Sequence, residues 1–129
     1  MKTQELEERI RQEALFDAEL IANNAAPTFS AFLVECAERA EIKRSDIIRA
    51  LNVDRNYGYQ LINGTRMPAR PQVLRMALLL RLDVSSAQKL LNLAGREALY
   101  VRRPEDARVV YCLEHNTPYE KACAFVWGE

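Results

Sequence analysis

Apolar residues recur every three or four positions along almost the whole chain. Nowhere do they alternate with polar residues for long enough to indicate a β-strand. The clearest run follows Thr28, which can cap a helix, and its apolar residues keep to one helical face: Phe29, Phe32, Leu33, Cys36, Ala37 and Ala40. The pattern therefore predicts an all-α protein.

Prolines, glycines and short polar residues divide this helical pattern into segments. A first amphipathic helix is predicted over residues 3–24, and Pro27 marks the boundary after it. Five core helices are predicted next, at about residues 28–40, 44–51, 55–63, 71–82 and 85–95. The expected domains are an N-terminal amphipathic helix (1–26), a five-helix domain (27–97) and a C-terminal helical extension (98–129).

The predicted helix ends depend on residues with particular capping properties. Asn52 and the Asn63-Gly64 pair tolerate the left-handed backbone conformation that ends a helix. Asp54 is placed to cap the third core helix, and Pro104 can open a helix in the extension. Two capping boxes are expected to open other helices, Ser85 with Gln88 and Thr117 with Glu120.

Charge is distributed unevenly, although 18 lysines and arginines balance 18 aspartates and glutamates. Residues 1–40 carry four basic and eight acidic side chains, and residues 82–129 carry six and seven. The middle of the chain, residues 41–81, carries eight basic side chains and three acidic ones. Arginine enrichment is common on solvated helical surfaces, but it is also the electrostatic footprint of nucleic-acid binding.

The predicted helix over residues 55–63 lies in this basic segment and has two distinct faces. At about 100° per residue, one face carries only Tyr57, Gly58 and Leu61. The opposite face carries a guanidinium, a phenol and three amides: Arg55, Asn56, Tyr59, Gln60 and Asn63. Arginine pairs with guanine edges, and asparagine or glutamine with adenine edges. Because the lysines and glutamates of an ordinary solvated face are missing, the pattern favours base recognition.

One ungapped stretch holds the residues Val53-Asp54-Arg55-Asn56-Tyr57, Leu61, Asn63-Gly64 and Thr65-Arg66-Met67-Pro68. This stretch resembles the recognition helix and following loop of the lambda-repressor-like (Xre/Cro type) helix-turn-helix family. The resemblance covers roughly half the chain and implies that family's five-helix fold. It also implies base contacts from Arg55, Asn56, Tyr59 and Gln60, and phosphate contacts from Arg44, Asn63, Thr65, Arg66 and Arg70.

Four positions depart from the family's usual pattern. A small residue is usual where this chain has Ile48, and a bulky aliphatic one where it has Gly58. Because the helices that carry them pack together, Ile48 can fill the space that Gly58 leaves. Arg44 replaces a glutamine, so it can reach phosphate without bracing the recognition helix in the same way. Asn52 takes the place of the glycine between the two helices.

Other kinds of site find little support in the sequence. The only histidine, His115, lies near Cys112, but the paired ligands that zinc requires are missing, so a structural or surface role is favoured. No catalytic or phosphate-loop motif occurs, so we expect neither enzyme activity nor a cofactor. The cysteines, three in number and set among apolar neighbours, are expected to be buried and reduced. We expect a cytoplasmic protein that does not enter a membrane.

These features predict a sequence-specific transcriptional regulator that inserts residues 55–63 into the major groove of double-stranded DNA. So short a helix reads about four or five base pairs, and we therefore expect a homodimer on two half-sites. Either extension could form the dimer or bind a protein partner. The alternative is a helical adaptor that keeps the fold and binds protein through Tyr57, Tyr59 and Gln60. Zero net charge and the acidic first forty residues favour this alternative.

Overall fold

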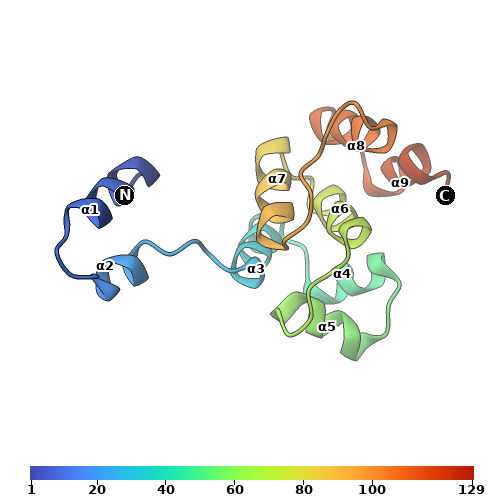
Figure 1. Ribbon diagram of the computed structural model, residues 1–129. Helices are drawn as coiled ribbons and strands as arrows, with labels where there is room; N and C mark the ends of the chain where they lie inside the picture. Colours follow the sequence, from blue (N-terminus) through green and yellow to red (C-terminus); the bar gives the residue numbers. More distant parts are fainter.

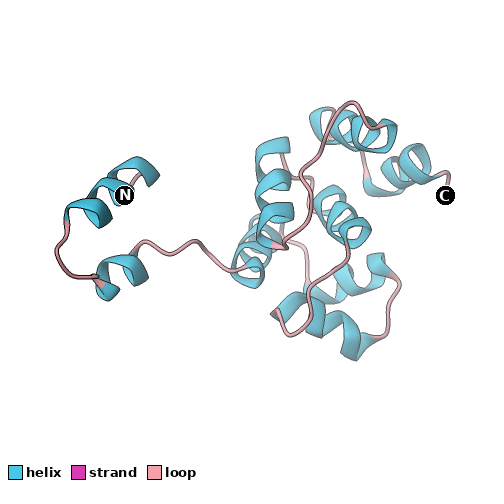
Figure 2. Ribbon diagram, in the orientation of Figure 1, coloured by secondary structure: helices cyan, strands magenta, loops and turns pink.

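Nine helices joined by short loops make up all the regular structure in the computed structural model, which describes residues 1–129 (Figure 1). No strand is present, so the predicted all-α class is confirmed (Figure 2). The helices are α1 (Thr3–Gln12), α2 (Ala18–Asn23), α3 (Phe29–Ala40), α4 (Arg44–Leu51), α5 (Arg55–Asn63), α6 (Arg70–Leu79), α7 (Val84–Leu93), α8 (Pro104–Glu114) and α9 (Tyr119–Trp127).

Helix α6 lies at the centre of the molecule and packs against α4, α7, α8 and α9. Its sequence is apolar nearly all round, and half of its residues are buried: Val73, Leu74, Met76, Ala77 and Leu78. A helix without a polar face is stable only when other elements cover it on several sides. The neighbours of α6 supply this cover.

Most helix ends agree with the capping residues predicted from the sequence. The Thr28 side chain accepts a hydrogen bond from the Ala31 amide at 3.1 Å and caps α3. Asn52 and Gly64 adopt the left-handed conformation, with φ of 53° and 86°, and end α4 and α5. The polar and glycine positions thus set the boundaries of the helices that surround the predicted site.

Two predicted capping boxes are wrong. Helix α7 begins one residue earlier than expected, because the Asp83 carboxylate accepts the Ser86 amide at 2.7 Å and takes the capping position from Ser85. Gln88 instead pairs through both side-chain atoms with the backbone of Leu99. Helix α9 begins after Pro118 without any side-chain cap.

The N-terminal segment also differs from the prediction, because it forms two helices and not one. The chain leaves helical conformation between α1 and α2, and the Asp17 carboxylate caps α2 by accepting the Leu20 amide at 3.0 Å. No side chain in residues 1–24 is buried. In Figure 1 these two helices lie apart from the other seven, joined to them by residues 24–28.

The C-terminal extension shares one hydrophobic core with α3–α7. The buried apolar residues of α8 and α9 belong to the same cluster as those of the central helices: Val109, Cys112, Leu113, Ala122 and Val126. All three cysteines are buried and free, as predicted. No helix of the chain has the length and apolar character needed to cross a membrane.

Candidate nucleic-acid interface

Helices α4 and α5 pack together through an unusually close approach at Gly58. A β-carbon built on Gly58 would lie 2.6 Å from Cγ2 and 2.7 Å from Cγ1 of Ile48, closer than carbon atoms pack. The Ile48 side chain therefore occupies the space that a larger residue at position 58 would need. Ile48 thus fills the space that Gly58 leaves, as expected from the sequence, and the two helices approach each other closely at this point.

Helix α5 is anchored at both ends by hydrogen bonds and along one side by burial. The Asp54 carboxylate accepts the Asn56 amide at 3.1 Å at the beginning of the helix. The Ser30 hydroxyl donates to the carbonyl of Ile62 at 2.7 Å near its end. Leu61 and Ile62 are buried in between. The helix is thus held in place, and its opposite face is presented to solvent in a fixed orientation.

The solvent-facing side of α5 carries polar groups that have no partner within the chain. Arg55 and Asn56 are exposed, and Tyr59 and Gln60 are half-buried. The side-chain amides of Asn56 and Gln60 form no intramolecular hydrogen bond, and the Arg55 guanidinium lies 5.8 Å from the centre of the Tyr59 ring. The structure therefore brings the four predicted base-contacting residues together on one face with their donors and acceptors available.

The loop after α5 is shaped by its own polar side chains. The Asn63 side-chain oxygen accepts hydrogen bonds from the Thr65 amide at 2.9 Å and the Thr65 hydroxyl at 2.6 Å. The Arg66 amide donates to the carbonyl of Gln60 at 3.1 Å. The Arg66 guanidinium lies 5.8 Å from the Tyr57 ring and forms no ion pair. The loop therefore holds an exposed cation beside the outer end of α5.

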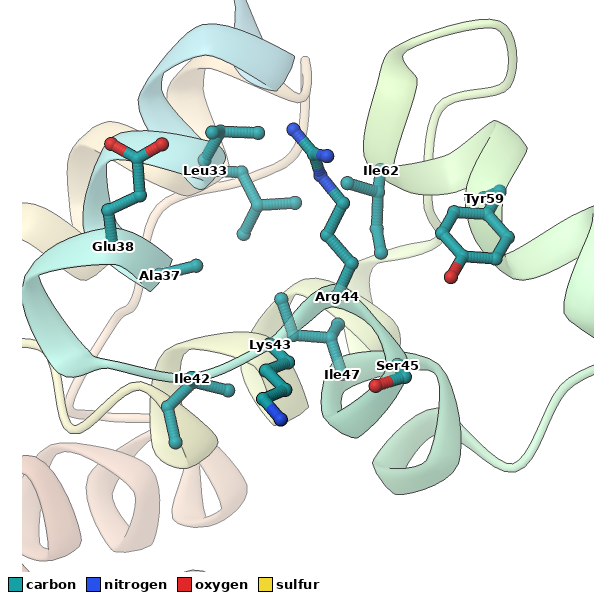
Figure 3. A pocket seen from close by; sticks show the side chains of 11 residues that line it. Leu33, Ala37, Glu38, Ile42, Lys43, Arg44, Ser45, Ile47, Tyr59 and Ile62 are labelled. Carbon is teal, nitrogen blue, oxygen red and sulfur yellow. The ribbon is translucent and has the colours of Figure 1, made fainter.

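A groove of about 430 Å³ lies between α3, the beginning of α4 and α5 (Figure 3). Lys43, Arg44 and Ser45 line its side toward α4, and Tyr59 lines the side toward α5. Figure 3 shows the Arg44 side chain between those of Leu33 and Ile62. Arg44 is exposed and has no ion pair. A second cationic position thus lies beside α5, in a hollow that Tyr59, Ile62 and Asn63 also line.

Lys43 and Arg49 also border this surface, although sequence reasoning assigned neither of them a role. Lys43 lines the groove beside Arg44, and Arg49 lines a neighbouring hollow of about 480 Å³ with Arg55 and Tyr59. Arg49 pairs at 3.2 Å with Asp46, an exposed pair that water can open readily. The excess of basic residues over 41–81 was the available signal for both, but it does not identify individual side chains.

Arg70 does not belong to this surface, which corrects its expected role as a phosphate contact. Its guanidinium donates to both carboxylate oxygens of Asp106, at 3.0 and 2.8 Å, and to the carbonyls of Glu97 and Ala98. Because these bonds engage the guanidinium at Nε and at both terminal nitrogens, few donors remain for a ligand. Arg70 instead joins α6 to the linker and to α8.

His115 is exposed near the end of α8, away from the polar face of α5. Its Nδ1 atom lies 2.8 Å from the carbonyl oxygen of Tyr111, and its ring stacks on the Tyr111 ring with centroids 4.0 Å apart. Stacking and this polar contact account for the position of the ring. The surface role favoured from the sequence is the one that the structure shows.

Comparison with protein-family models, with curated proteins and with solved structures found no match to this chain.

Proposed function

We propose that the chain is a sequence-specific DNA-binding transcriptional regulator and that α3–α7 form a helix-turn-helix domain of the lambda-repressor-like kind. The observation that carries the proposal is the pair of side-chain amides on α5, those of Asn56 and Gln60, which form no hydrogen bond within the chain and lie near exposed cations. Residues 52–54 join α4 to α5. Two short helices joined by a tight turn, the second with a polar outer face, are typical of this motif.

In the proposed complex, α5 enters the major groove and its outer face reads base edges. Arg55 can donate two hydrogen bonds to guanine, and the amides of Asn56 and Gln60 can each donate and accept at adenine. Tyr59 lies beside Arg55 and lines the same hollow. A helix of nine residues is about 14 Å long, which suits the reading of about four or five base pairs.

Phosphate contacts are proposed beside α5 and after its end. Arg44, at the beginning of α4, lines a hollow together with Asn63, and Thr65 and Arg66 follow the end of α5. The positive end of the α4 dipole adds to the charge of Arg44. Contacts from α4 and from the loop after α5 would fix the angle at which α5 meets the groove, since phosphate contacts set register and orientation. The proposed function involves no catalysis and no cofactor.

The dependence of binding on salt concentration tests this function. A labelled duplex of mixed sequence is titrated with the protein at about 50 and 200 mM salt, and fluorescence anisotropy reports binding. Neutralising about four phosphates should weaken binding roughly 100-fold between these conditions. Binding that does not change with salt, or no binding at the lower salt, would contradict the proposal.

A protein-binding adaptor is the second function that a specific observation favours. Tyr111 and Phe125 are both about half exposed, at 52% and 49%, and their rings lie 5.5 Å apart on α8 and α9. Exposed neighbouring aromatic side chains are enriched where proteins bind each other. Under this alternative Tyr57, Tyr59 and Gln60 would contact the partner as well. A protein-binding adaptor of this kind would not bind the labelled duplex at about 50 mM salt, and the titration therefore separates the two functions.

A further inference from the structure

The pair of helices at the N-terminus exposes apolar side chains that no other part of the chain covers. Leu15 and Phe16, between the helices, are 83% and 75% exposed, and Ile10 at the end of α1 is 47% exposed. Together with Leu20 and Ile21 they line a hollow of about 190 Å³ between α1 and α2. No hydrogen bond or ion pair joins residues 1–27 to the rest of the chain. Exposed apolar groups so arranged favour association with another surface.

The distribution of charge along α1 is complementary to that of a second, antiparallel copy of the same helix. The acidic residues Glu5, Glu7 and Glu8 come first along the helix, and the basic residues Arg9 and Arg11 follow them. A parallel pair of such helices would set like charges against each other. An antiparallel pair would set the acidic half of each helix against the basic half of the other, which is self-complementary.

The positions of the charges around α1 agree with this arrangement. Leu6 and Ile10 lie one turn apart on one face of the helix. At about 100° per residue, Glu5 and Arg9 flank this apolar stripe on one side, and Glu7 and Arg11 flank it on the other. When Leu6 of one helix packs against Ile10 of an antiparallel copy, each flank brings its glutamate beside the arginine of the second copy. The apolar and charged patterns are therefore compatible with the same register.

We infer that α1 and α2 form the homodimerisation element of this protein, through antiparallel pairing of the α1 helices of two copies. This inference concerns assembly and stands independently of whether α5 binds DNA. The ion pair between Arg9 of α1 and Glu13, the residue after α1, is long, at 3.6 Å, and both side chains are about half exposed. So weak an internal pair leaves Arg9 free to exchange partners.

The linker makes this dimer compatible with two separated α5 helices. Residues 24–28 can extend by about 17 Å, so two linkers together reach about 34 Å before the size of the paired helices is added. Successive major-groove half-sites on one face of DNA lie about 34–36 Å apart. Dimerisation through the N-terminal helices therefore allows both copies to reach adjacent half-sites.

Reciprocal charge reversal in the full chain tests the pairing without DNA. One variant carries Glu5→Arg and Glu7→Arg, the other Arg9→Glu and Arg11→Glu. Sedimentation equilibrium should show the parent as a dimer and each variant with self-association at least tenfold weaker, because four attractive pairs become repulsive. An equimolar mixture of the two variants should recover the dimer, since only the mixed pair sets opposite charges together.

Three outcomes would overturn the inference: a monomeric parent, variants that dimerise like the parent, or a mixture that stays monomeric. A matched control with Glu114→Arg and Glu120→Arg makes the same change in net charge at exposed positions of α8 and α9, and should dimerise normally. Circular dichroism should show unchanged helix content in every variant, because no side chain of residues 1–24 is part of the core. A monomeric parent whose DNA affinity rises when residues 1–24 are deleted would indicate an inhibitory arm instead.

Discussion

Gly58 and Ile48 fit together so closely that a single added methyl group cannot be accommodated without movement. The β-carbon of an alanine at position 58 would lie 2.6 Å from Cγ2 and 3.1 Å from Cβ of Ile48. These Ile48 atoms are at or next to the branch point of a side chain with restricted rotation, so they have little freedom to move aside. The pair therefore sets how far α5 stands from α4 and how far its polar face projects.

Gly58→Ala is expected to lower the free energy of unfolding by up to about 2 kcal/mol, because overpacking costs about 1–3 kcal/mol and alanine recovers roughly 1 kcal/mol as a helix former. Ile48→Ala alone should cost about 2–5 kcal/mol by leaving a cavity. In the double variant the new methyl group fills part of that cavity, so the two losses should not add. Urea denaturation of the four proteins measures this, and strictly additive losses would show that the contact is not tight.

Arg66→Ala should weaken binding to all DNA sequences by a similar factor and reduce the slope of log affinity against log salt by about 0.9. The reason is that a phosphate contact releases counterions without reading bases. Arg102→Ala removes an exposed arginine from the linker after α7 and serves as the control, with no change in slope. If the loss depended on the DNA sequence, Arg66 would be a base contact and its assignment wrong.

Gln60→Ala and Asn56→Ala should each relax the preference at particular base pairs at a cost of about 1–3 kcal/mol for the preferred site. Their affinity for scrambled sites should change little, because neither amide is assigned to phosphate. Titrations with the preferred duplex and a scrambled duplex of equal composition provide the measurement. Equal losses on both duplexes would remove these side chains from base recognition.

The stability of the chain should fall in acid partly through Asp106, which is 1% exposed. Burial raises the pKa of this carboxyl, but hydrogen bonds from Arg70 and the Tyr100 amide, with the charges of Arg70 and Arg103, outweigh burial and hold it below its usual value. A carboxyl with a lowered folded pKa stabilises the protein above its unfolded pKa of about 3.9. That stabilisation is lost as pH falls through the folded pKa.

Asp106→Asn should therefore lower the free energy of unfolding by about 3 kcal/mol at pH 7, because it leaves the Arg70 charge without its counterion, and by less at pH 3, which is below the unfolded pKa. The comparison is made by urea denaturation of parent and variant at both pH values. An equal loss at pH 7 and pH 3 would mean that the ion pair contributes no pH-dependent stability. Glu97→Gln, at an exposed carboxyl that pairs with Arg103, is the surface control and should cost little.

Much of the fold could be predicted because local signals and burial agree in the central helices. The apolar face of α3, the all-round apolar character of α6 and the left-handed residues Asn52 and Gly64 each indicate the structure that formed. The prediction of one helix over residues 3–24 was wrong, because the helical spacing of the apolar residues continues across the break between α1 and α2. Because these apolar residues do not pack against the core, their spacing alone does not stabilise one continuous helix. The chain breaks after α1, and Asp17 caps the second helix, α2.

The polar face of α5 was also predictable, since helical geometry alone places its residues side by side. The partner of Arg70 was not, because Asp106 lies 36 residues away in the sequence and is brought close only by the packing of α8. The partners of Arg75 were equally unpredictable from the sequence. Its guanidinium lies 4.3 Å from the centre of the Trp127 ring and pairs with Glu129. Both arginines belong to the basic segment 41–81 of the sequence, but in the folded chain they contact the C-terminal part of the protein.

Selection of binding sites from a pool of random DNA duplexes is the most direct test of the claim that α5 reads sequence. If α5 reads sequence, a motif of about four or five base pairs should be enriched. If the N-terminal helices pair, this motif should appear as two copies centred about 10–10.5 base pairs apart. Gln60→Ala should lose the preference at one position of that motif while still binding DNA. Recovered duplexes with no sequence enriched over the starting pool would contradict the account.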